Sequence, residues 1–155
     1  MHIHRLEKIW ITIGIAMLGV FLLVVGVGAF AMGMQPPTGH VHLDPEKLAE
    51  TPPFDQPGLV QVGEKEYNAY IIAQVFSYSP NRIEIPVGST VHFEVTSPDV
   101  VHGFQITGTT VNIMAIPGEV NRYSFTFDKP GEYLILCNEY CGAAHELMMA
   151  TLIVS

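Results

Sequence analysis

The chain has 155 residues, which is enough for one ordinary domain with an anchor and too few for two full domains. It carries 7 Lys and Arg against 15 Asp and Glu residues, a formal net charge of −8. Without a basic block to neutralise phosphates, this composition argues against nucleic-acid binding. The acidic surface suits a cationic partner, although simple solubility explains it as well.

The N-terminal segment is predicted to be a membrane-spanning helix. The run from Ile9 to Ala31 contains no charged residue. As a helix it would be roughly 34 Å long, which exceeds the ~30 Å hydrocarbon core of a bilayer. Arg5 and Lys8 precede the run, so the positive-inside rule places the N-terminus in the cytoplasm, and Trp10 suits the membrane interface.

A cleaved signal peptide is the alternative for this segment, because Ala29-Phe30-Ala31 resembles a small-x-small cleavage site. Signal peptides have apolar regions of about 7–15 residues, and this run is longer. We therefore expect a retained anchor in the cell (plasma) membrane, with the rest of the chain on the periplasmic or extracytoplasmic side.

The next passage, residues 35–58, is predicted to be a Pro-rich linker between a tail with its helix, 1–34, and a β domain, 59–155. Prolines interrupt it repeatedly, so it is expected to lack regular structure apart from one short helix. That helix would cover Asp44 to Glu50, with Asp44 as N-cap and Pro45 at the first helical position. The pair His40 and His42 is interpreted as part of a loop without metal.

From about Leu59 the pattern is that of β-strands, short and rich in Val, Ile, Tyr, Phe and Thr. With turn signals between them, they predict a mainly β fold, a Greek-key sandwich or barrel. The predicted strands are Tyr67–Phe76, Arg82–Ile85, Thr90–Thr96, His102–Ile106, Asn112–Ala115, Arg122–Phe127, Glu132–Cys137 and Met149–Val154.

Alternation within the predicted strand Thr90–Thr96 removes one histidine from the candidate metal ligands. His92 shares a face with Thr90 and Glu94, opposite the valines of the same strand. We therefore expect His92 to face solvent and assign it no ligand role.

A cluster of potential metal ligands follows the predicted strand that ends at Cys137. Two thiols, an imidazole and a thioether lie within twelve residues, at Cys137, Cys141, His145 and Met148. Soft sulfur ligands together with imidazole favour copper over hard cations. A second imidazole must come from another strand, and His102, which opens a strand after a turn, is the candidate.

Three other interpretations of this cluster remain open at this point. The two cysteines could form a disulfide, which would leave His145 and Met148 unexplained. Two cysteines and two histidines could hold structural zinc, but such sites normally show paired short spacings. Cys141, His145, Met148 and His102 alone would make a mononuclear blue-copper site. That site would leave Cys137 idle, whereas two bridging thiolates between two coppers use every ligand.

The stretch C-x-E-x-C-x₃-H-x₂-M, with the upstream segment Thr96 to His102, resembles the CuA domain of cytochrome c oxidase subunit II. The resemblance implies a cupredoxin-like fold, a binuclear copper centre and transfer of electrons from a soluble cytochrome c to haem in subunit I. It implies that two cysteines bridge the coppers, that each histidine binds one copper, and that a thioether and a main-chain carbonyl complete the set. The implied ligands are His102, Cys137, Glu139, Cys141, His145 and Met148.

The single predicted span resembles the smaller subunit II of cytochrome-ba-type oxidases of thermophilic bacteria. The family also implies subunit I, and in some complexes a small third subunit, as partners. In many oxidases the carboxylate at the position of Glu139 holds an interface magnesium, which is not expected in the single-span branch. Met149 is interpreted as strand core, while Phe76, Tyr78 and Asp99 are candidates for the electron route or for docking.

Two functions from other classes compete with this interpretation. One is a membrane-anchored blue-copper carrier or copper chaperone, which would bind one copper per chain. The other is the copper-free subunit II of a quinol oxidase, which an intact ligand set argues against. Oxygen reduction itself would belong to another subunit, because this chain has neither a haem-attachment motif nor several membrane spans.

Overall fold

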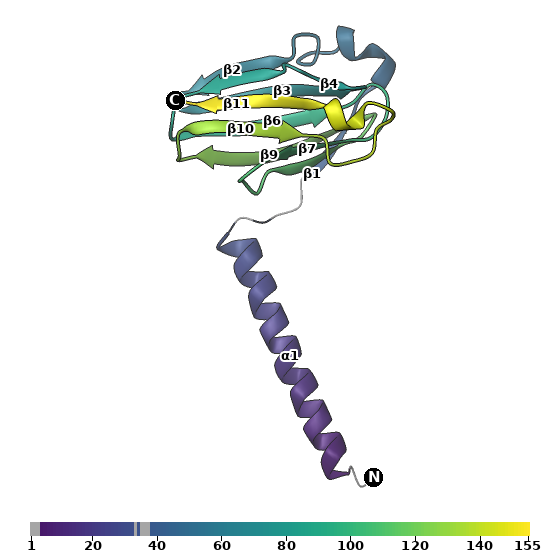
Figure 1. The fold of residues 1–155 in the computed structure, drawn as a ribbon, viewed down its shortest axis with the longest axis vertical. Coiled ribbons are helices and arrows are strands. Elements are labelled where there is room, and N and C mark those ends of the chain that lie inside the picture. The colour runs from purple at the N-terminus through teal and green to yellow at the C-terminus, as the bar shows by residue number, and fades with distance from the viewer. Residues whose placement is uncertain (1–3, 33, 35–37) are drawn as a thin grey trace. The chain divides into compact units, whose positions relative to one another are not determined.

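The computed structural model describes residues 4–32, 34 and 38–155. The chain divides into two compact units, residues 1–36 and 37–155. The first contains one helix and the second is a β domain (Figure 1).

Helix α1 covers Arg5–Phe30, and its length and composition suffice to cross a membrane. It begins after His4, whose ring nitrogen Nδ1 accepts a hydrogen bond from the backbone N–H of Leu6 at 3.3 Å. None of the helical residues is buried within the chain. A helix that exposes apolar side chains all round is typical of a membrane span. The predicted helix is thus present. It begins four residues before Ile9, so that Arg5 and Lys8 lie in its first turn.

The β domain consists of two sheets packed face to face, with the strands of both running across the domain in Figure 1. The six-stranded sheet has the order β1 (Thr38–His42), β9 (Glu119–Phe127), β6 (Ser89–Thr96), β3 (Glu66–Gln74) and β2 (Gly58–Gly63), with β4 (Ser77–Ser79) also paired to β3. The five-stranded sheet has the order β5 (Arg82–Ile85), β11 (Met149–Val154), β10 (Gly131–Leu136), β7 (His102–Ile106) and β8 (Asn112–Ala115).

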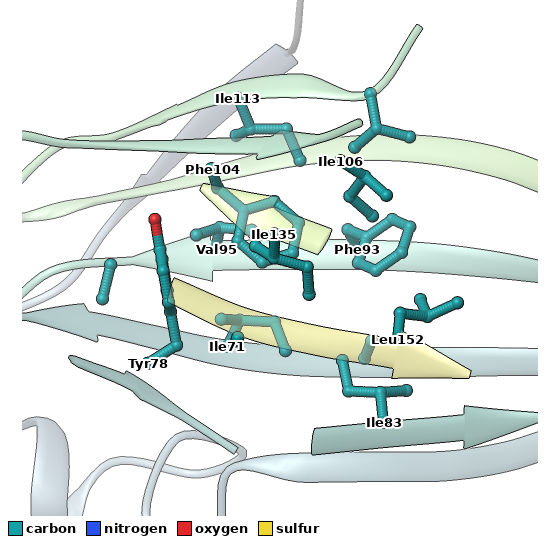
Figure 2. Packing of buried hydrophobic residues seen from close by; sticks show 14 of the residues in the cluster. Ile71, Tyr78, Ile83, Phe93, Val95, Phe104, Ile106, Ile113, Ile135 and Leu152 are labelled. Atoms are coloured by element: carbon teal, nitrogen blue, oxygen red, sulfur yellow. The ribbon is translucent and has the colours of Figure 1, made fainter. Parts of the chain in front are cut away.

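The main core lies between the inner faces of the two sheets (Figure 2). The ring of Phe93 from β6 packs against that of Phe104 from β7, with centroids 5.5 Å apart. Every second residue of β6 is fully buried, as the alternation in the sequence predicts. His92 lies on the opposite face, where its ring contacts Ser124 and Glu66, so the prediction that it is not a ligand is consistent with its position.

Regular structure in the Pro-rich passage was underestimated, because residues 38–42 form the edge strand β1 and pair with β9. The short helix is present as a 3₁₀ helix over Pro45–Glu50, with Asp44 as its N-cap. Leu48 and Phe54 pack with Val120 of β9 into a second, smaller core. Strand β1 forms backbone hydrogen bonds with β9, and this pairing does not require alternating apolar residues in β1 itself.

Three further details differ from the expectations drawn from the sequence. The predicted strand Tyr67–Phe76 ends at Gln74, and the chain reverses there into β4. Met149 is not a core residue: it is 48% exposed, because the inward positions of β11 are Ala150 and the residues that alternate with it. Strand β2 was also missing from the predicted strands, which begin at Tyr67.

Candidate metal centre

The candidate ligands come from three neighbouring strands and meet at one end of the domain. His102 opens β7, Cys137 directly follows β10, and Met148 directly precedes β11. Since β10 runs antiparallel to both β7 and β11, its last residue, Leu136, lies opposite the first residue of β11, and the chain beyond it runs toward the beginning of β7. The connection between β10 and β11 then carries the remaining ligands at the same end, including His145 in a short 3₁₀ turn.

The two cysteines are free thiols whose Sγ atoms lie 3.8 Å apart, and both are buried. A ring nitrogen of His102 lies near both sulfurs, and the three atoms are all within 4.8 Å of one another. A disulfide is therefore not formed in this structure. Among the described residues this is the only cluster of three or more such groups able to hold a metal ion.

The imidazole of His102 is fully buried, and only one of its two ring nitrogens has a hydrogen-bond partner. Its Nε2 bonds Oδ1 of Asp99 at 2.8 Å, while its Nδ1 is buried without a hydrogen-bond partner. Leaving a buried ring nitrogen unpaired costs on the order of 1–3 kcal/mol. The free nitrogen is the one available to a metal, and binding one beside the two thiols would satisfy it. The chemistry of the site thus fits a metal ion with a preference for sulfur and imidazole.

The other three predicted ligands each contact one of the two sulfurs. The ring Nδ1 of His145 lies 3.5 Å from Sγ of Cys141, and Sδ of Met148 lies 3.7 Å from the same atom. The Cys137 thiol donates a hydrogen bond to the main-chain carbonyl of Glu139 at 3.1 Å. All six residues therefore lie together at one end of the domain, with the carbonyl of Glu139 beside the thiol of Cys137.

The thiol of Cys141 is kept protonated in the metal-free chain. Burial raises its pKa to about 11, with further contributions from the hydrogen bond and the charge of Cys137. Because a metal binds the thiolate, loading the site must release this proton.

Asp99 holds several parts of the site with one carboxylate. Oδ1 accepts from His102 and from the backbone N–H of Val100, while Oδ2 accepts from the backbone N–H of Val75 at 2.8 Å. Burial acts to raise the pKa of Asp99, but these hydrogen bonds and that of Ser97 outweigh it and lower the pKa. Asp99 thus orients the ligand His102 and ties it to the connection between β3 and β4.

Two glycines allow the ligand loop to approach its neighbours. Continuing the register of β10 and β7 brings Asn138 opposite Gly103, and a Cβ on Gly103 would lie 2.6 Å from the backbone nitrogen of Asn138. Gly142, directly after Cys141, has φ +134°, and a Cβ there would lie 3.0 Å from the ring of Phe76. The partly buried ring of Phe76 therefore packs against the ligand loop.

Tyr78 belongs to the core beneath the site and is not on the surface. Its side chain is 3% exposed, its ring packs edge-on against Phe104, and its hydroxyl donates to the carbonyl of Gly103. Burial and the neighbouring Cys137 raise its pKa strongly. A docking role for Tyr78 does not fit this position, whereas support for the strand that carries His102 does.

Sequence reasoning did not single out Tyr140 or Asn138. Tyr140 is 81% exposed, and its ring lies 5.9 Å from that of His145, measured between centroids. Asn138 packs onto Gly103 and donates to Oδ1 of Asn112 at 3.1 Å. Both lie between predicted ligand positions, which is the one signal by which the sequence could have marked them.

The fold and the cluster together define a class: a β-sandwich of the cupredoxin kind, preceded by an apolar helix and carrying a cysteine–histidine site for a metal. The periplasmic domain of subunit II of cytochrome oxidase from Bradyrhizobium japonicum shares this fold. It has a TM-score of 0.53 at 23% identity, over 62% of this chain and 87% of that chain.

The family described as cytochrome c oxidase subunit II, periplasmic domain, matches residues 64–154. A cytochrome c oxidase subunit 2 of Thermus thermophilus is 40% identical over 152 residues, 96% of this chain and 90% of that protein. A second Thermus thermophilus protein of the same name is 44% identical over 72% of this chain and 84% of that protein. A chain in the cryo-EM structure of a haem-copper terminal oxidase dimer has a TM-score of 0.82 at 35% identity, over 97% of this chain and all of that one.

The chain belongs to the cytochrome c oxidase subunit II family. It is a subunit of a haem-copper oxidase, an oxidoreductase complex, and its partners include other subunits of that complex. The resemblance found in the sequence is thereby confirmed, and the single N-terminal helix fits the single-span type. Membership and the apolar helix make it a membrane protein of a copper-binding family.

Proposed function

We propose that this domain carries a binuclear CuA centre through which electrons pass from a soluble cytochrome c to haem in subunit I, where oxygen is reduced. The observation that carries the proposal is the pair of buried free thiols, Cys137 and Cys141, 3.8 Å apart beside the unpartnered Nδ1 of His102. Two thiolates so close together can bridge two coppers, whereas one copper needs only one of them.

The ligand roles follow from which sulfur or nitrogen each residue offers. Cys137 and Cys141 would bridge the coppers, and His102 and His145 would each bind one. Met148 would be the weak ligand of one copper, and the carbonyl of Glu139 would complete the other. When bound, the two coppers supply a one-electron redox couple in which the electron is shared between them.

The chain itself contributes a rigid cage for that couple. The ligands are anchored at the ends of β7, β10 and β11, and Asp99 fixes the ring of His102 through its Nε2. Such a cage limits movement of the ligands when the charge of the centre changes. Because protein groups complete the ligand set, no position is open to a substrate, which suits relay of electrons and not catalysis at the metal.

A mononuclear blue-copper centre is the alternative, and one feature favours it. Cys141 alone has both His145 and Met148 within 3.7 Å, so it could serve one copper together with His102. In that arrangement Cys137 would have no role.

Copper counting and EPR spectroscopy of the oxidised protein distinguish the two centres. We expect two coppers per chain and hyperfine lines from one electron shared by two coppers. Cys137→Ser should convert this spectrum to that of a single copper, while the exposed control Met149→Leu should leave it unchanged. One copper per wild-type chain, or zinc in its place, would contradict the proposal.

We also propose roles for the residues around the centre. The ring of Phe76 packs against Gly142, next to Cys141, which supports a place for Phe76 on the route by which electrons enter. Phe76→Leu should slow reduction by cytochrome c without loss of copper, and reduction by a small soluble reductant serves as the control. An unchanged rate with cytochrome c would remove Phe76 from the route.

The membrane arrangement is proposed from the helix and its flanking charges. Arg5 and Lys8 at the start of α1 support a cytoplasmic N-terminus in the plasma membrane, with the copper domain on the periplasmic side. Protease added to cells with a permeabilised outer envelope should then digest the β domain. Protection of the domain in such cells would reverse the orientation.

A further inference from the structure

The two candidate histidine ligands are held in different ways. His102 is fully buried, and the carboxylate of Asp99 fixes its ring through Nε2 at 2.8 Å. His145 is only partly buried, and its Nδ1 lies 3.5 Å from Sγ of Cys141. Among the residues that the structure describes, none forms a hydrogen bond with Nε2 of His145. Histidine ligands normally have an orienting partner on the second ring nitrogen, so another contact is needed to hold this ring.

The backbone of His145 is fixed by two hydrogen bonds within the ligand loop. Its N–H donates to the carbonyl of Gly142 at 3.2 Å, and its carbonyl accepts from the N–H of Met148 at 3.1 Å. These bonds hold the short 3₁₀ turn His145–Leu147 in place. They do not restrict rotation of the ring about its own side-chain bonds, so the direction of the imidazole depends on what touches it.

The ring of Tyr140 supplies such a contact. Its centroid lies 5.9 Å from that of the His145 ring, and the two planes are tilted by 57°, an arrangement in which aromatic rings attract one another. Tyr140 is 81% exposed, so burial of its own side chain does not explain its position. It stands between Glu139 and Cys141, two proposed ligands, and its backbone is therefore part of the loop that surrounds the site.

We propose that Tyr140 is a positioning residue for His145: its ring holds the imidazole in the direction needed to bind the metal and covers it against water. The inference rests on the proposed function, because a positioning role requires a metal on His145. The two histidines are then held by different means, a carboxylate for the buried His102 and an aromatic ring for the partly exposed His145. Because access of water to a metal site affects its redox potential, the cover also tunes that potential.

The first measurement uses the full-length chain without copper, in detergent. Diethyl pyrocarbonate reacts with accessible imidazoles, and mass spectrometry of the digested protein gives the reaction rate at each histidine. Tyr140→Ala should raise the rate at His145 roughly two- to tenfold, the factor that corresponds to one aromatic contact, whereas Tyr140→Phe should leave it unchanged. His92, whose side chain is 34% exposed on the other sheet, is the internal reference in every sample.

The second measurement uses the same chain loaded with copper. A chelator should remove copper from Tyr140→Ala faster than from the wild type, by a similar factor. The redox potential of Tyr140→Ala should be lower, because water stabilises the oxidised form, which carries one more positive charge. Tyr140→Phe should match the wild type in both quantities.

The matched control for these variants is Leu147→Ala. Leu147 is 66% exposed in the same loop, so its truncation also removes a large exposed side chain near the site. It should change neither the reaction rate at His145 nor the redox potential. Tyr140→Leu separates the ring from its bulk and should lie between the wild type and Tyr140→Ala.

Two results would overturn the proposal. If Tyr140→Ala changes neither the reaction rate at His145 nor the redox potential, the tyrosine does not position this ligand. If Tyr140→Phe is as impaired as Tyr140→Ala, the hydroxyl is responsible and the ring contact is not. Failure of the proposed function gives a different result, because copper counts and EPR of the wild type decide whether the centre is binuclear, and the rate measured without copper does not depend on them.

Discussion

Two neighbouring methionines differ sharply in burial, and this difference decides which can serve the proposed copper site. Met148 is 1% exposed with its sulfur 3.7 Å from Sγ of Cys141, while Met149 is 48% exposed. The chain enters β11 between them, so successive side chains point to opposite faces. Of the two, only Met148 is therefore placed to act as the proposed thioether ligand.

Replacing the two methionines in turn tests this assignment. Met148→Leu should keep both coppers, because a weak ligand is lost, but should shift the redox potential and the EPR spectrum. Met149→Leu should change neither quantity. The measurements are a potentiometric titration and EPR on both variants, and an equal shift in the two would show that Met148 is not a ligand.

The raised pKa of Cys141 predicts how the copper-free protein responds to alkaline pH. A thiol whose pKa is higher in the folded than in the unfolded chain stabilises the fold below the unfolded value, about 8.5–9, and loses this contribution as pH rises through about 11. The free energy of unfolding should therefore fall between these values.

Denaturation of the copper-free protein under reducing conditions, followed by circular dichroism across this pH range, measures the effect. Cys141→Ser should make the curve flatter, because the titrating thiol is gone, while other alkaline titrations stay the same in both proteins. A curve of the same slope for the wild type and Cys141→Ser would contradict the prediction.

At the scale of elements, the site depends on how closely β7 approaches the ligand loop. Gly103 faces Asn138 so tightly that no side chain fits between them, and the hydroxyl of Tyr78 fixes the carbonyl of the same glycine. The strand that carries His102 is thus held from both sides. Asp99 adds a third link, from His102 to the backbone of Val75.

Gly103→Ala should therefore push the loop away from β7 and disturb the metal site. We expect a loss of about 1–3 kcal/mol in the free energy of unfolding, typical of an overpacked contact, together with weaker copper binding. Gly58→Ala in β2 is the matched control, because a Cβ there meets no atom within 4 Å. Thermal unfolding and copper titration of both variants provide the check, and equal copper affinity in the two would count against the close contact.

At the scale of the whole molecule, the chain separates into a helical unit and a β domain with different tasks. The boundary of the β domain lies earlier than the sequence suggested, because β1 and the cluster of Leu48, Phe54 and Val120 belong to it. The Pro-rich passage thus packs and pairs with the β domain and is more than a linker.

Two shortened proteins test this division. Residues 38–155 should fold in aqueous solution and give the copper spectrum of the full chain. Residues 59–155 should be less stable by roughly 3 kcal/mol or more, because burial of Leu48 and Phe54 is worth ~1.5–3 kcal/mol each. Chemical denaturation of both proteins measures the difference. Equal stability would show that residues 38–58 act only as a linker.

Periodicity predicted most of the strands, because the side chains of a half-buried strand must alternate between core and solvent. The bounds of β5, β7, β8 and β11 agree with the prediction. The strands β1 and β2, the short β4 and the early end of β3 were not predicted, because pairing with a neighbour decides them. The exposure of Met149 was not predicted either, because both faces of β11 carry apolar residues and only the packing of the sheets decides which face is buried.

The order of ligand types along the loop and an upstream histidine identified the family and all six candidate ligands, since donor chemistry and spacing are properties of the sequence. The tertiary structure decided what those residues can do. It left Nδ1 of His102 without a partner beside two thiols, placed Asp99 behind its ring, and buried Tyr78 beneath the site. These features join residues distant in sequence, and only the pairing and packing of the two sheets bring them together.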